Sequence, residues 1–203
     1  TASGAETIPF LKVWGVVPGA IIFMLVYAKL SNILSKEALF YTAIAPFLAF
    51  FALFAFFLYP NREMFHPTTS ADYLQSLLPA GLSGLVACYR DWTFSLFYVL
   101  AELWGSAVLS LMFWGFANDI MRVTEAKRFY TLLGLGANVA LLVSGPTIVY
   151  FSDIQSRIPA GVDPWQVSLN YLMTFVVLAG LSVVGIYYWM NRKVLTDTRF
   201  YNP

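Results

Sequence analysis

The sequence contains one cysteine, Cys88, and one histidine, His66, among 203 residues. A single cysteine excludes an intrachain disulfide and any metal centre built from several thiolates. His66 lies in a polar connection between apolar runs. Haem or zinc ligation inside an apolar segment is therefore not expected. We expect no bound metal and no cofactor.

Charged residues are also scarce. They make up 11% of the chain, and the formal net charge is +1, whereas a typical soluble domain carries roughly 25% charged residues. A nucleic-acid-binding chain needs a basic surface. The near-zero net charge therefore argues against a nucleic acid partner.

Apolar residues are abundant, at 59% of the chain, and the mean hydropathy is +0.69. A water-soluble protein of this size has too small a core to bury so much apolar surface. The excess must face the lipid bilayer. Apolar runs of about 20 residues are long enough to cross the hydrocarbon, and they must be helical because lipid cannot satisfy the backbone.

The sequence therefore predicts an all-α polytopic membrane protein, with residues 1–203 forming one helical bundle. Five spans are expected, at residues 8–30, 38–59, 92–116, 129–151 and 167–190. The segment between Ser76 and Ala87 is too short and too rich in glycine and proline for a span. We interpret it as interfacial or re-entrant.

The basic residues predict the orientation of these spans. Alternate connections place eight on one side: Lys29, Lys36, Arg122, Lys127, Arg128, Arg192, Lys193 and Arg199. Four fall on the other: Lys12, Arg62, Arg90 and Arg157. Because lysine and arginine are enriched in cytoplasmic connections, the first group should be cytoplasmic. The first span then starts outside, which predicts a further span before residue 1.

Glu102 is the leading candidate site residue, because it lies near the middle of the third span. An ionisable group there costs several kcal/mol and marks a functional site by default. Tyr98, Glu102 and Ser106 recur at helical spacing, within a polar stripe that also contains Ser95, Gly105 and Ser110. The alternative is a structural hydrogen bond from Glu102 to a neighbouring helix.

Asn138 and Lys12 are further candidates. Asn138 shares a face of the fourth span with Thr131, Gly134 and Gly145, and its amide could bind a ligand or a neighbouring helix. Lys12 lies close to the start of the first span. Its ammonium group could extend to the lipid headgroups, or face a cavity and attract an anion. Gly15 and Gly19 follow it as a potential close-packing motif.

Enzymatic functions fit poorly. No histidine lies in any span to act as a base for a serine nucleophile, and paired intramembrane aspartates are absent from the sequence. A non-transporting membrane scaffold or assembly subunit remains the alternative from a different functional class.

Long segments of the chain resemble the nucleotide transport protein (ATP/ADP translocase) family of chlamydiae, rickettsiae and plastids, and most of all its chlamydial members. The segments are IPFLKVWGVVPGAIIFMLVYAKLSNILSKEALFY (8–41), FYVLAELWGSAVLSLMFWGFAND (97–119), EAKRFYTLLGLGANVALLVSG (125–145) and KVLTDTRFYNP (193–203). The resemblance covers essentially the whole chain.

That family has twelve spans and is similar to the major facilitator superfamily. The resemblance implies that this chain supplies spans two to six of an N-terminal half, without the first span or the second half of the transporter. It also implies exchange of ATP for ADP, with or without phosphate, by alternating access. The expected location is the inner membrane of a chlamydia-like bacterium or a plastid inner envelope. Paralogues that carry other nucleotides by proton symport remain an alternative.

The resemblance also implies roles for individual residues. Glu102 matches a glutamate of the family's fourth span that is tied to nucleotide transport, and Asn138 matches an asparagine expected near the substrate phosphates. We hypothesise that Glu102 accepts hydrogen bonds from ribose or the adenine amino group, or pairs with a cavity lysine supplied by the missing spans. Tyr98 is the first candidate to stack on adenine.

Overall fold

The structure is a computed structural model that describes residues 7–121, 123–154, 158–159 and 161–196. Every regular element in these ranges is a helix. The chain divides into two compact units, residues 1–111 and 112–203.

The five predicted spans are confirmed. Helices long and apolar enough to cross a membrane cover Thr7–Ser31, Lys36–Leu58, Trp92–Ile120, Tyr130–Asp153 and Pro164–Val194. Their ends differ by a few residues from those expected from hydropathy. The helices include polar residues at their ends that a hydropathy run leaves out. Glu37, for example, lies in the first turn of its helix, where Ser35 caps the backbone N–H of Ala38.

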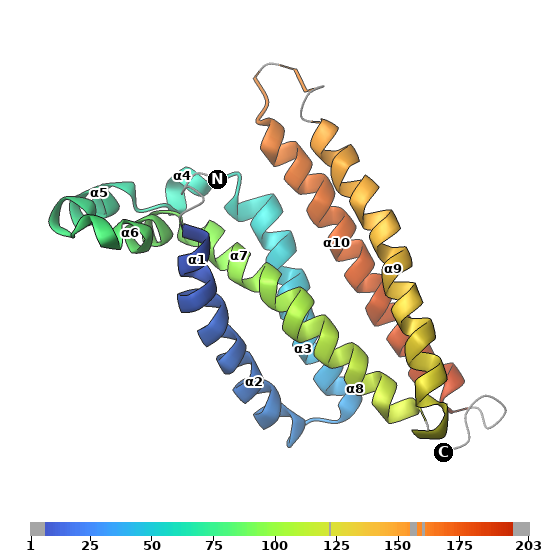
Figure 1. Ribbon diagram of the computed structural model, residues 1–203. Helices are drawn as coiled ribbons and strands as arrows, with labels where there is room; N and C mark the ends of the chain where they lie inside the picture. Colours follow the sequence, from blue (N-terminus) through green and yellow to red (C-terminus); the bar gives the residue numbers. More distant parts are fainter. Residues whose placement is uncertain (1–6, 122, 155–157, 160, 197–203) are drawn as a thin grey trace. The chain divides into compact units, whose positions relative to one another are not determined.

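The first unit contains the first two spans, most of the third and a group of short helices (Figure 1). Its elements are α1 (Thr7–Leu11), η1 (Lys12–Val16), α2 (Val17–Ser31), α3 (Lys36–Leu53), η2 (Phe54–Leu58), α4 (Arg62–Phe65), α5 (Thr68–Leu77), η3 (Ala80–Leu82), α6 (Ser83–Arg90), α7 (Trp92–Leu103) and η4 (Trp104–Leu109). The short helices α4 to α6 lie between the second and third spans.

The core of this unit is built on α3 and η2, which pack against α2 and against the span formed by α7 and η4. Buried residues recur along them at helical spacing: Leu39, Phe40, Ala43, Ile44, Phe47, Leu48, Phe51, Phe54, Ala55 and Leu58. Aromatic rings join the second and third spans. Phe54 stacks on Phe97 with ring centroids 4.3 Å apart, and Phe51 meets Trp104 edge-on.

Each span of the first unit includes a π-helical segment, namely η1, η2 and η4. In a π turn the backbone hydrogen bonds join residues five apart instead of four, and such turns are frequent at functional sites. Segment η1 begins at Lys12, and η4 begins two residues after Glu102. The two candidate charged residues therefore lie beside irregular turns.

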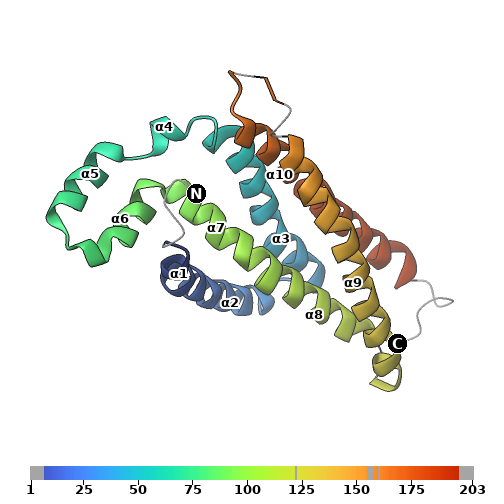
Figure 2. The same ribbon diagram turned by 45° about the horizontal axis from the view of Figure 1, so that its top comes forward.

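Helices α5 and α6 form an antiparallel pair, here the α5–α6 hairpin. Both views show it projecting sideways from the start of α7, next to α1 (Figures 1 and 2). The predicted interfacial segment 76–87 corresponds to the end of α5, the turn through Pro79, and most of α6. It is not a span.

The second unit contains most of α8 (Ser110–Ile120), α9 (Val123–Asp153), α10 (Pro164–Trp189) and η6 (Met190–Val194). Helices α9 and α10 pack together. Ser168 donates a hydrogen bond to the backbone carbonyl of Phe151 at 2.8 Å, and the ring of Phe151 stacks on Tyr171. Asp163 caps α10 by accepting from the backbone N–H groups of Trp165 and Gln166.

Candidate functional site

The first and third spans approach closely at two glycines of the first span, Gly15 and Gly19. A Cβ atom at Gly15 would lie 2.7 Å from Cγ2 of Val99, and one at Gly19 would lie 3.2 Å from Cδ1 of Leu103. Glycine permits this approach because it has no side chain. The predicted close-packing role of the glycine pair is thus confirmed, and its partner is the third span.

This packing brings Lys12 next to Glu102. The Nζ atom of Lys12 lies 3.7 Å from Oε1 of Glu102. Tyr98, one turn before Glu102 on α7, donates its hydroxyl hydrogen bond to the same Oε1 at 3.0 Å. One carboxylate oxygen therefore receives a cation and a neutral donor. We refer to Lys12, Tyr98 and Glu102 as the charged cluster.

The charged cluster is open to the surroundings of the first unit. The side chain of Lys12 is 59% exposed and that of Glu102 is 39% exposed. An ion pair with this exposure is worth about 0–1 kcal/mol in water. It therefore holds its partners only weakly there, and a ligand with its own charge can compete for either one. In an apolar environment the attraction within the pair is much stronger.

Ser106 does not add a donor to the Glu102 carboxylate. Its hydroxyl donates to the backbone carbonyl of Glu102 at 2.6 Å. This local bond occupies a carbonyl at the start of the π-helical segment η4, where the regular helical pattern is interrupted.

Asn138 lies on α9, in the second unit. Its side-chain amide nitrogen donates to the carbonyl of Gly134, one turn earlier on the same helix, at 3.0 Å. Of the five candidates, the structure thus brings Lys12, Tyr98, Glu102 and Ser106 together on two spans of the first unit. Asn138 bonds within its own helix.

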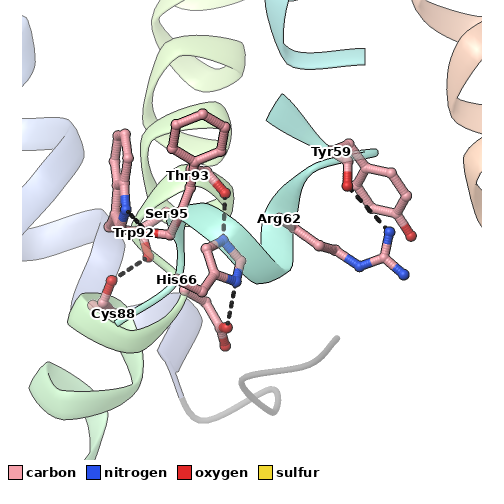
Figure 3. Close-up of polar contacts among 9 residues, drawn as sticks. Tyr59, Arg62, His66, Cys88, Trp92, Thr93 and Ser95 are labelled. Atoms are coloured by element: carbon pink, nitrogen blue, oxygen red, sulfur yellow. Dashed lines mark hydrogen bonds and ion pairs between the residues drawn. The ribbon is translucent and has the colours of Figure 1, made fainter. Parts of the chain in front are cut away.

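A second polar cluster was not predicted. His66, in the connection after α4, lies with Nδ1 3.4 Å from Oδ1 of Asp91 and Nε2 2.6 Å from Oγ1 of Thr93 (Figure 3). The ring meets Phe94 edge-on, and Trp92 donates to the carbonyl of Phe65 at 2.9 Å. These contacts tie the connection to the first turn of α7.

The surroundings shift the acid–base properties of this region. Burial lowers the pKa of His66, the positive charge of Arg62 lowers it further, and the carboxylate of Asp91 opposes both effects. Burial also raises the pKa of the Cys88 thiol. The sequence alone did not predict this cluster, because His66 and Asp91 are 25 residues apart and no sequence pattern indicates that they are in contact.

Metal chemistry finds no support in the part of the chain that the structure describes. No group of three or more histidine, cysteine, aspartate or glutamate side chains there could hold a metal ion. The charged cluster itself has one carboxylate, one ammonium and one phenol. It can pair with charges and exchange hydrogen bonds.

Comparisons with known proteins agree on one family. Residues 1–203 match the family model described as TLC ATP/ADP transporter. ADP,ATP carrier protein 1 of Chlamydia pneumoniae is 62% identical over 99% of this chain and 39% of the relative. ADP,ATP carrier protein 2, chloroplastic, of Arabidopsis thaliana is 54% identical over 97% of this chain and 32% of the relative. ADP,ATP carrier protein 1 of Rickettsia bellii is 44% identical over 100% of this chain and 40% of the relative.

The chain thus spans between 32% and 40% of the length of these relatives. No solved structure matches it.

Proposed function

Because the chain belongs to the TLC ATP/ADP transporter family, we propose that it forms part of a nucleotide antiporter that exchanges ATP for ADP by alternating access. The observation that carries this proposal is the Lys12–Glu102 ion pair, which joins two apolar spans and keeps both side chains partly exposed. Ionisable groups at membrane depth mark substrate pathways. Phosphate is included as a further substrate, since a lysine that binds nucleotide phosphates also suits the free anion.

In the proposed mechanism, Lys12 changes partners. A nucleotide phosphate competes with Glu102 for the ammonium group, and Glu102 then accepts hydrogen bonds from the ribose or the adenine amino group. Without Lys12 the carboxylate would repel a triphosphate. The sequence hypothesis expected the lysine partner from spans outside this chain, and the Lys12–Glu102 contact supports a partner within it instead.

Tyr98 keeps the carboxylate oriented during this change, because its hydroxyl already bonds to Oε1 of Glu102. Stacking of the Tyr98 ring on adenine stays a prediction. So does the donation of the Asn138 amide to phosphate oxygens, which concerns the second unit. The proposed location is the cytoplasmic membrane of a chlamydia-like bacterium, or alternatively a plastid inner envelope, because the relatives come from chlamydiae, rickettsiae and plants.

Counter-exchange tests the proposal. The full-length protein is reconstituted in liposomes loaded with ADP, and uptake of labelled external ATP is followed. We expect uptake that requires internal ADP and is largely lost in Glu102→Gln. Glu63→Gln is the matched control, because it makes the same chemical change on an exposed residue of α4, outside the spans. That variant should exchange like the parent protein.

Other outcomes separate the alternatives. Uptake driven by a proton gradient into vesicles without nucleotide would favour proton symport. No uptake of any nucleotide by well-folded protein would overturn the transporter proposal and favour a membrane scaffold. Normal exchange by Glu102→Gln would leave the transporter but remove Glu102 from its mechanism.

A further inference from the structure

The α5–α6 hairpin has an exposed apolar face that the transport mechanism does not use. Ser70, Tyr73 and Leu77 are spaced at i, i+3 and i+7, so they share one face of α5. Leu85 and Tyr89 are spaced at i and i+4 on α6. Tyr73 and Leu77 are 66% and 62% exposed, and Leu85 and Tyr89 are each 45% exposed.

The two apolar stripes lie on the same side of the hairpin. The hydroxyl groups of Tyr89 and Ser70 are 3.3 Å apart, which places the α6 stripe next to the α5 stripe. Leu78 directly follows α5, and Leu82 directly precedes α6. Both are also exposed and apolar. We define Tyr73, Leu77, Leu78, Leu82, Leu85 and Tyr89 as the hairpin face.

The rest of the hairpin is held by the protein itself. Ala71 and Val86 are buried. Arg90 pairs with Asp72 and donates to Gln75 at 2.9 Å, which links the two helices. Helix α6 also packs on the start of the first span, where a Cβ atom at Gly84 would lie 3.6 Å from the ring of Phe10. The hairpin is thus fixed to the end of a span.

The position of the hairpin favours a lipid surface as the partner of this face. The second span ends at Leu58 and the third begins at Trp92, so the connection between them leaves and re-enters the membrane at one surface. Both views show α5 and α6 lying across the direction of α3 and α7 (Figures 1 and 2). A helix pair attached to span ends and lying across them is placed to lie along a bilayer surface.

We propose that the hairpin face is a membrane anchor that inserts into the boundary between lipid headgroups and acyl chains. Amphipathic helices bind such surfaces through buried apolar area and through attraction of basic residues to anionic lipids. In α5 and α6 the charged side chains are Asp72 and Arg90, which pair with each other. Apolar insertion therefore drives binding, and anionic lipid is not required.

Site-directed spin labelling tests this anchor in the full-length protein, with Cys88→Ala and any other cysteine replaced. Labels are placed at Leu77→Cys and Leu85→Cys, with Tyr73→Cys as a second reporter on α5 should the first fail to fold. Thr68→Cys is the control, because Thr68 is exposed but lies on the opposite face of α5. It is nine residues from Leu77, which is two and a half helical turns. Collision with oxygen, which concentrates in lipid, is compared with collision with a water-soluble nickel complex.

We expect the ratio of oxygen to nickel collisions to be several-fold higher at Leu77 and Leu85 than at Thr68, and equal in neutral and anionic vesicles. If the ratios of oxygen to nickel collisions at Leu77 and Leu85 were as low as that at a water-exposed Thr68, the proposal would be overturned, because the hairpin face would then be in contact with water. Shielding of the Leu77 and Leu85 labels from both reagents would also overturn it, because protein would cover the face. A high ratio confined to anionic vesicles would contradict apolar insertion. None of these outcomes depends on the transported solute.

Discussion

At the scale of single residues, Glu102 could be singled out from the sequence as a candidate, whereas its contacts with Lys12 and Tyr98 could not be predicted. A lone carboxylate in an apolar run stands out by the physical cost of burying it. Its contact with Lys12 depends on how the first span lies against the third, which hydropathy does not encode. Tyr98 was selected by its spacing on the same helix, but the bond from its hydroxyl to Glu102 became visible only in the structure.

The Tyr98 hydroxyl should matter for exchange. In Tyr98→Phe the ring stays and the bond to Oε1 of Glu102 is lost. Because a hydrogen bond to a charged group is worth about 1.5–3 kcal/mol, exchange should fall by at least about tenfold, and by less than in Glu102→Gln. Initial rates of labelled ATP uptake measure this. Tyr89→Phe is the control, because it removes the hydroxyl of a tyrosine outside the spans and should leave exchange unchanged. If exchange were also unchanged in Tyr98→Phe, the orienting role of Tyr98 would be contradicted.

His66 should make stability depend on pH. Burial lowers its pKa in the folded protein, while an unfolded histidine titrates at about 6.5. Between these two values the unfolded chain binds more protons, so stability is complete above about pH 6.5 and falls as pH decreases toward the folded pKa. The melting temperature of the purified protein should therefore drop more steeply between neutral and mildly acidic pH than that of His66→Gln. Parallel curves for the two proteins would refute this assignment.

At the scale of elements, the spans followed from hydropathy because the lipid requirement is strict. The π-helical segments η1, η2 and η4 could not be predicted, since the widened turns arise from packing between spans and no sequence pattern specifies them. The hairpin was recognised only as a segment too short to span. Its apolar face becomes apparent once Ser70 and Tyr89 are seen together.

The approach of the first and third spans should be sensitive to one methyl group. In Gly15→Ala the new Cβ atom would meet Cγ2 of Val99 at 2.7 Å, so the spans must shift. Overpacking of this kind costs about 1–3 kcal/mol, and it should also separate Lys12 from Glu102. We expect a lower melting temperature and slower exchange, with both restored in the Gly15→Ala, Val99→Ala double variant.

Gly185→Ala provides the control for this pair. A Cβ atom at Gly185, on α10, meets nothing within 4 Å, and alanine favours helix over glycine by about 1 kcal/mol. This variant should keep or raise the melting temperature. A Gly15→Ala protein as stable as the parent would show that the spans have room to spare at this contact.

At the scale of the whole chain, charge and hydropathy together predicted a membrane protein with a defined orientation. In the residues that the structure describes, five helices are long and apolar enough to cross a membrane, as predicted. The family assignment rests on long stretches of similarity that no single physical property supplies.

The distribution of basic residues makes the orientation testable. The connection between the first two spans is flanked by Lys29 and Lys36, so it should be cytoplasmic, whereas the connection that contains α4 should lie on the opposite side. Single cysteines are introduced at Asn32 and Glu63, both exposed, in a background with Cys88→Ala. A membrane-impermeant thiol reagent should modify Glu63→Cys in intact cells, and Asn32→Cys only after the membrane is opened. The reverse pattern would invert every span. The hairpin face would then lie at the cytoplasmic surface, although its proposed insertion into lipid would be unaffected.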